Sequence, residues 1–129
     1  MEAKTATQLV QEAKQRVQNL TVAQVAAELA TGTVTLVDLR EPAELQAGTI
    51  PGALHAPRGM LEFYADPTSA YHRPELAPTR RVILHCASGG RSALAAGTLQ
   101  HMGYTNVAHL EGGFKAWEAA GQPVTKPSG

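Results

Sequence analysis

The chain has 129 residues, 43% of them hydrophobic, which suffices for one compact core but not comfortably for two domains. The net charge is zero and the basic residues are scattered, so neither nucleic acid nor a membrane surface is an expected partner. A single cysteine excludes an internal disulfide and predicts a reduced compartment, and no Cys/His spacing predicts a metal or cofactor. The sequence shows no signal peptide and no stretch of transmembrane length, so we expect a cytoplasmic protein.

The first predicted elements are two helices. Apolar residues recur at helical spacing and predict an amphipathic helix over residues 4–18 that serves packing. Thr21 is a typical N-cap because Gln24 follows three positions later, and Gly32 has the place of a helix terminator. A second helix is therefore predicted between these signals.

The rest of the chain alternates between predicted strands and helices. The strands are predicted at Thr33–Asp38, Leu54–Ala56, Val82–His85 and Val107–Leu110. The helices are predicted at Glu41–Gln46, Ser92–Met102 and Phe114–Ala120. Three prolines and little periodicity predict a long surface loop over residues 66–78, which we expect to flank the site. This alternation predicts an α/β fold with a central, mostly parallel sheet of four to five strands flanked by helices.

The residues that can carry chemistry are concentrated in the segment HCASGGRS, where the third predicted strand ends. Cys86 lies at that strand end, where parallel sheets place their functional groups. The residues that follow it are Ala87, Ser88, Gly89, Gly90, Arg91 and Ser92. Small residues allow the backbone N–H groups to converge on the sulfur, and the helix start adds its positive dipole end. Such surroundings lower a thiol pKa from about 8.5 to about 7 or less, so a reactive cysteine is predicted rather than an inert buried one.

Three segments of the chain, in the same order, resemble the signatures of a single-domain rhodanese. They are VDLREPAELQAGTIPGALHAP, CASGGRS and GYTNVAHLEGGFKAWEAAGQPV. The resemblance implies a rhodanese-like fold, a sulfur-accepting cysteine at Cys86, and amides between Cys86 and Arg91 that hold a persulfide. We accordingly divide the chain into an N-terminal helical extension, a rhodanese-like domain and a flexible tail, at residues 1–20, 21–124 and 125–129.

The resemblance also implies an activity, that of a thiosulfate sulfurtransferase. Its cysteine takes sulfur from a donor such as thiosulfate or 3-mercaptopyruvate and passes it to cyanide or a thiol. No general base is required if the cysteine is already ionised. Related phosphatases place the arginine six positions after the cysteine, whereas Arg91 follows Cys86 by five, which favours sulfur transfer. The competing interpretation is a binding or carrier module that presents a persulfide to a protein partner.

Three further polar residues are candidates for a place near the cysteine. Asp38 and Arg40 match the family's Asp-x-Arg element and support the site from the same sheet edge, through an ion pair or through substrate contact. His85 neighbours Cys86 in a strand, so its side chain is expected on the opposite face and not as a base.

Arg58 and the closing glycines carry weaker signals. Arg58 is a candidate for binding a donor anion, because a guanidinium can bind a sulfonate or carboxylate in two places, but a solvated surface role is equally compatible. Gly112 and Gly113 are expected to shape a turn before the last helix, in which Phe114 and Trp117 are core anchors.

Overall fold

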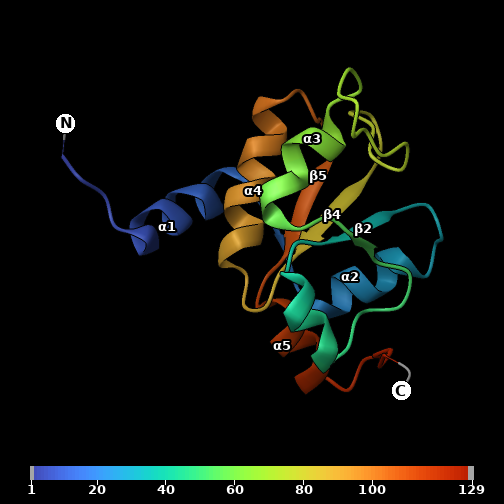
Figure 1. Cartoon of the computed structure of the whole chain (residues 1–129). Helices are drawn as coiled ribbons and strands as arrows, with labels where there is room; N and C mark the ends of the chain where they lie inside the picture. Colours follow the sequence, from blue (N-terminus) through green and yellow to red (C-terminus); the bar gives the residue numbers. More distant parts are fainter. Residues whose placement is uncertain (1, 128–129) are drawn as a thin grey trace.

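The computed structural model describes residues 2–127 and contains one five-stranded sheet in which every pair of neighbours is parallel (Figure 1). The strands are β1 (Gln18–Leu20), β2 (Thr35–Asp38), β3 (Leu54–His55), β4 (Val82–His85) and β5 (Val107–Leu110). Their order in the sheet is β1-β5-β4-β2-β3. The predicted α/β fold with a mostly parallel sheet of four to five strands is confirmed.

Helices cover both faces of this sheet. The helices are α1 (Ala6–Arg16), α2 (Val22–Leu29), α3 (Leu61–Ala65), α4 (Gly90–His101) and α5 (Gly113–Ala119), with two short 3₁₀ turns, η1 (Pro42–Ala47) and η2 (Arg58–Met60). In β4 the side chain of Leu84 packs in the core beneath α3 and α4, and that of Ile83 packs in the core beneath α2 and α5. Both faces of the central strand are therefore buried, which explains its unbroken apolar sequence.

The helix α2 begins where the sequence predicts, whereas α1 begins two residues after its predicted start. Thr21 accepts a hydrogen bond from the N–H of Gln24, whose side chain accepts one from the N–H of Thr21 in return. This reciprocal capping box fixes the start of α2. Gly32, with a φ of 74°, follows the end of the helix in a conformation that glycine adopts without strain.

The N-terminal extension differs from its prediction at one end. Residues 18–20 form β1, an edge strand that pairs with β5 and places Leu20 beside Leu110. Their assignment to a helical extension is therefore wrong, because only one of these three residues is buried and so short a segment shows no period. The helix α1 itself packs against α4, and Met1 lies outside the described residues.

The loop over residues 66–78 lacks regular structure, as predicted, but it does not flank the cysteine. The carbonyl of Glu75 accepts a hydrogen bond from Thr35 at 3.0 Å, and the carbonyl of Pro78 accepts one from the N–H of Thr105 at 3.1 Å. Thr35 begins β2, whereas Cys86 follows the end of the parallel strand β4. The loop therefore lies at the opposite edge of the sheet (Figure 1).

The predicted flexible tail is attached to the domain where it begins. Thr125 exchanges two backbone hydrogen bonds of 2.8 Å with Thr49, and the ammonium group of Lys126 donates to the carbonyl of Ala47. Residues 128–129 of the predicted tail lie outside the described part of the chain. Within residues 2–127, no helix combines the length and the apolar character needed to cross a membrane.

Candidate active site

Cys86 follows β4 directly, at the carboxyl edge of the sheet, with only 1% of its surface exposed. Its sulfur accepts a hydrogen bond from the N–H of Gly89 at 3.2 Å and lies 3.7 Å from the hydroxyl oxygen of Ser92. The helix α4 begins at Gly90, two residues earlier than predicted. The loop of small residues after the cysteine therefore folds back so that Gly89 and Ser92 contact the sulfur.

Gly89 allows the chain to turn back over the sulfur. Its φ of 105° is a conformation that residues with a side chain rarely adopt. A Cβ atom at this position would also lie only 3.2 Å from the backbone nitrogen of Gly112. The N–H of Gly89 can therefore face the sulfur only because the residue is a glycine.

The first turn of α5 fixes the orientation of this loop. The N–H of Phe114 donates to the carbonyl of Cys86 at 2.8 Å, and the N–H of Lys115 donates to the carbonyl of Ala87 at 3.0 Å. In a trans peptide the N–H points opposite to the C=O. The N–H groups of Ala87 and Ser88 therefore face away from α5, and the Ser88 N–H lies among the donors that act on the sulfur.

Gly113 makes this close approach of α5 possible. It has a φ of 61°, and a Cβ atom on it would lie 2.6 Å from the carbonyl oxygen of Cys86 and 2.7 Å from that of Ala87. The sequence predicts a turn at Gly112 and Gly113 but not its contact with the cysteine loop. Nothing local signals this contact, since the two segments are far apart in the chain.

The surroundings of the sulfur favour a thiolate. Burial alone would raise the pKa of the Cys86 thiol, but hydrogen bonds from the backbone and hydroxyl of Ser92 and from the N–H groups of Gly89 and Ser88 outweigh it. The pKa of Cys86 is consequently lowered from its ordinary value. Such hydrogen bonds stabilise the charged form because each donor points at the atom that carries the charge.

Arg91 lies beside the sulfur but is held by a carboxylate. Its guanidinium donates to both oxygens of Glu44, at 2.7 and 2.9 Å. These hydrogen bonds, with a smaller contribution from the nearby Cys86 sulfur, raise the pKa of Arg91. The same pair lowers the pKa of Glu44 to about 2. The guanidinium of Arg91 is therefore already bound to an anion, the Glu44 carboxylate.

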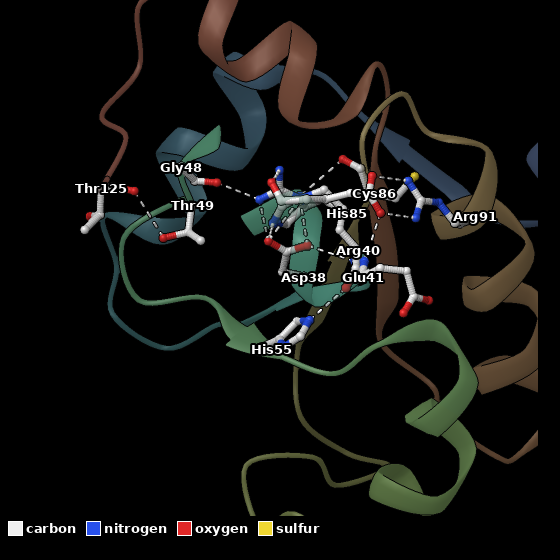
Figure 2. A network of polar contacts seen from close by, with 11 residues as sticks. Asp38, Arg40, Glu41, Gly48, Thr49, His55, His85, Cys86, Arg91 and Thr125 are labelled. Atoms are coloured by element: carbon white, nitrogen blue, oxygen red, sulfur yellow. Dashed lines mark hydrogen bonds and ion pairs between the residues drawn. The ribbon is translucent and has the colours of Figure 1, made fainter. Parts of the chain in front are cut away.

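Asp38 and Arg40 form a buried ion pair (Figure 2), which is one of the two roles that the sequence predicts for them. A nitrogen of the Arg40 guanidinium lies 2.8 Å from the Asp38 carboxylate and 2.8 Å from the carbonyl of Gly48, and the group stacks 4.2 Å from the Phe114 ring centre. Burial opposes the charge on Asp38, but Arg40 and His85 outweigh it and lower the pKa of Asp38. The pair therefore holds η1 and α5 to the end of β2.

His85 faces this ion pair and not the sulfur. Its Nε2 lies 3.6 Å from the Asp38 carboxylate and lacks a hydrogen-bond partner among residues 2–127. Its Nδ1 lies 3.4 Å from the carbonyl of Cys86, and burial lowers the pKa of His85. This geometry agrees with the expectation that His85 is not a base for Cys86.

Arg58 lies with α3 and α4 instead of the cysteine loop. It donates to the Glu62 carboxylate at 2.8 Å and to the Thr98 hydroxyl at 3.4 Å. Both partners lie outside residues 86–92, and the side chain is partly exposed. The structure therefore shows no contact between Arg58 and the sulfur site within the described chain.

Two polar residues that are linked to Ser92, namely His109 and Asn19, were not predicted from the sequence. The hydroxyl of Ser92 lies 2.8 Å from Nδ1 of His109, and Nε2 of His109 lies 2.6 Å from the amide oxygen of Asn19. His109 is fully buried in the otherwise apolar strand β5. A histidine within an otherwise apolar strand is the signal that could have indicated a role for His109. Within residues 2–127, no group of three or more His, Cys, Asp or Glu side chains could hold a metal ion.

Comparison with known proteins agrees with this geometry. A sequence profile for the rhodanese-like domain matches residues 21–120. A sulfurtransferase from Allochromatium vinosum is 37% identical over 99 residues, which cover 77% of this chain and 85% of that protein. Thiosulfate sulfurtransferase GlpE from Pseudoalteromonas translucida is 32% identical over 102 residues, which cover 79% of this chain and 90% of that protein.

A solved structure shares the fold along almost the entire chain. The protein, from Rhodopseudomonas palustris, is described as having unknown function and as a possible tyrosine phosphatase. It is 40% identical, has a TM-score of 0.87, and the match covers 96% of each chain. Because the domain profile spans most of the sequence and the relatives extend over most of their own lengths, this chain belongs to the rhodanese-like family of sulfurtransferases.

Proposed function

We propose that this protein transfers sulfane sulfur from an anionic donor such as thiosulfate to a thiophilic acceptor, through a persulfide on Cys86. The observation that carries the proposal is the set of N–H groups around a single buried sulfur, with Gly89 donating to it at 3.2 Å. These donors lower the pKa of Cys86 and are positioned to stabilise negative charge on a sulfur atom. The chain has no other cysteine that could carry the sulfur.

The proposed reaction has two displacement steps. The Cys86 thiolate attacks the outer sulfur of thiosulfate, the sulfur–sulfur bond of the donor breaks, and sulfite leaves with the electron pair. Cyanide or a thiolate then attacks the outer sulfur of the persulfide and breaks its bond to Cys86. This second step releases the product and restores the thiolate, so neither step needs an external oxidant or reductant.

Hydrolysis of phosphate esters fits the site less well. Arg91 follows Cys86 by five positions, which leaves a shorter loop than the six-position spacing of related phosphatases. Both terminal nitrogens of the Arg91 guanidinium also donate to the Glu44 carboxylate. A phosphate group would therefore meet a loop that is one residue shorter than in those phosphatases.

The direct test incubates the protein with thiosulfate or 3-mercaptopyruvate, adds cyanide, and measures thiocyanate and intact mass. We expect the mass of one added sulfur atom before cyanide and its loss afterwards. Cys86→Ser is expected to fold, as judged by circular dichroism, but to form no adduct. Turnover in that variant, or a wild-type protein that never gains sulfur, would exclude the covalent mechanism.

Arg58 is proposed as a contact for the donor anion. To bind the donor, the guanidinium of Arg58 would have to leave the Glu62 carboxylate, to which it donates at 2.8 Å. Arg58→Ala is expected to raise KM for thiosulfate with little change in kcat, because a ground-state contact is lost. An unchanged KM for both anionic donors would leave Arg58 with its structural contacts only.

A further inference from the structure

We propose that Ser92 and His109 form a proton relay that receives the proton of the Cys86 thiol, and that Asn19 positions His109 for this task. The inference deepens the proposed function and rests on it, since it concerns how Cys86 reaches the thiolate form. It assigns a role to two residues outside the cysteine loop, in β1 and β5.

The need for a relay follows from the burial of the sulfur. Cys86 is 1% exposed, so its proton passes more readily to a protein group in contact with the sulfur than to bulk water. Its contact with Gly89 is to a backbone N–H, which donates a hydrogen bond and cannot accept a proton. The hydroxyl of Ser92, 3.7 Å from the sulfur, can both accept and donate. It is therefore the contact through which the proton can leave.

The hydrogen bonds beyond Ser92 set the direction of the relay. The amide nitrogen of Asn19 donates to the carbonyls of Lys14 and Val17, at 2.9 and 3.2 Å, which leaves its oxygen facing His109. That oxygen accepts from Nε2 of His109, so in the neutral ring Nδ1 carries no proton. Nδ1 then accepts from the Ser92 hydroxyl at 2.8 Å, whose oxygen is free to accept from the thiol.

The proposed step moves two protons and leaves the total charge of the three side chains unchanged. The thiol proton passes to the oxygen of Ser92 while the hydroxyl proton of Ser92 passes to Nδ1 of His109. The bonds S–H and O–H break, new O–H and N–H bonds form, and the products are a thiolate and an imidazolium. Ser92 then donates no longer to His109 but to the sulfur, which adds one more donor to the thiolate.

The charges around His109 suit a group that ionises only together with Cys86. Its burial lowers the pKa of His109, the Glu111 carboxylate 3.6 Å away raises it, and Lys14 lowers it. Lys14 is paired with Glu111 at 2.6 Å, which offsets the effect of that carboxylate. His109 is therefore neutral beside a neutral thiol. The negative charge of the thiolate supplies the missing stabilisation, so the two groups titrate as a pair.

The N-terminal segment is thereby part of the site. Asn19 lies in β1, ahead of the 21–120 stretch that matches the rhodanese-like profile. Its side chain is locked by the carbonyl of Lys14 in α1 and contacts a histidine 90 positions later. The structure assigns this segment a positioning role, through His109, in the ionisation of Cys86.

The first test measures the rate at which iodoacetamide alkylates Cys86 as a function of pH. His109→Asn keeps a hydrogen-bond acceptor for Ser92 but removes a base, and is expected to move the midpoint up by about one unit, about tenfold slower at neutral pH. Asn19→Asp places a carboxylate on Nε2 and is expected to move the midpoint down. The matched control is His101→Asn, which removes an exposed imidazole from α4 and should change nothing.

The second test uses the wild-type protein, so it does not depend on the folding of a variant. Nitrogen NMR of His109 is expected to show the Nε2–H tautomer with the thiol and both nitrogens protonated when Cys86 ionises. Alkylation of Cys86 should return His109 to the neutral form at the same pH. A histidine that stays neutral while Cys86 ionises, or equal midpoints for His109→Asn and His101→Asn, would overturn the relay.

Neither test uses a sulfur donor, which separates this inference from the proposed function. Thiocyanate formation with an unaltered alkylation profile in His109→Asn would refute the relay alone. The expected profile and NMR response without any sulfur transfer would refute the proposed function alone, and support the relay.

Discussion

The contact between α5 and the cysteine loop predicts a large effect from one methyl group. In Gly113→Ala the new Cβ would lie 2.6 Å from the carbonyl oxygen of Cys86 and 2.7 Å from that of Ala87. Both atoms belong to backbone and cannot rotate away as a flexible side chain could. The loop and the start of α5 must therefore separate, which breaks the hydrogen bonds that Phe114 and Lys115 donate to the loop.

The expected loss of stability can be worked out from these contacts. A residue with a side chain at the φ of 61° of Gly113 costs about 1 kcal/mol. Each of the two lost hydrogen bonds is worth about 1 kcal/mol. The free energy of unfolding should thus fall by about 3 kcal/mol. The released peptides also no longer aim their N–H groups at the sulfur, so the pKa of Cys86 should rise.

Gly121→Ala provides the matched control. Gly121 follows the other end of α5 with a φ of 74°, but a Cβ atom there would meet nothing within 4 Å. This variant should therefore lose only about 1 kcal/mol. Urea denaturation measures both losses, and iodoacetamide alkylation against pH reports the thiolate. Equal destabilisation by the two substitutions, with an unchanged alkylation profile for Gly113→Ala, would refute the reasoning.

Three further predictions concern the charged residues and the loop length. Asp38→Asn leaves the buried Arg40 without its partner and should lower the free energy of unfolding by about 3 to 5 kcal/mol in urea; a loss below about 1 kcal/mol would contradict a buried pair. Because the pKa of Asp38 is lowered in the folded state, this contribution is present above its unfolded value near 3.9 and lost as pH falls through the folded value. Glu44→Gln should free Arg91 for the donor and lower KM for thiosulfate by up to about fivefold, since a partly exposed ion pair is worth at most about 1 kcal/mol; a raised KM would show that Glu44 helps to bind the donor. Inserting one glycine between Gly90 and Arg91 should slow thiocyanate formation at least about a hundredfold, and a parental rate would remove the argument from loop length.

The sequence predicts the elements whose signals are local. The strands β2, β4 and β5 are buried at all positions, so their apolar runs are visible without knowledge of the fold. The capping pair Thr21 and Gln24 lies within one helical turn. The cysteine loop is equally local, because small residues, a strand end and a helix start follow one another.

The features that were missed depend on contacts between distant segments. The strand β1 has three residues and takes its structure from pairing with β5, so it carries no period of its own. His109 and Asn19 are 90 positions apart, and neither has a neighbour in sequence that suggests a link to Cys86. The contact between Gly113 and the cysteine loop likewise joins segments that are far apart in the chain. Sequence patterns report which face of an element is buried, but not which polar atoms meet across the fold.

The position of β1 has a consequence for the synthesis of the chain. The first strand to be made pairs with the last, so it must wait until β5 has left the ribosome before the sheet is complete. Pairing across such a separation is slow, because the whole intervening loop must close first. The hydrogen bonds that α5 donates to the cysteine loop form late for the same reason, because α5 follows β5 in the chain. A nascent chain that still lacks α5 therefore lacks the two hydrogen bonds with which Phe114 and Lys115 hold the cysteine loop.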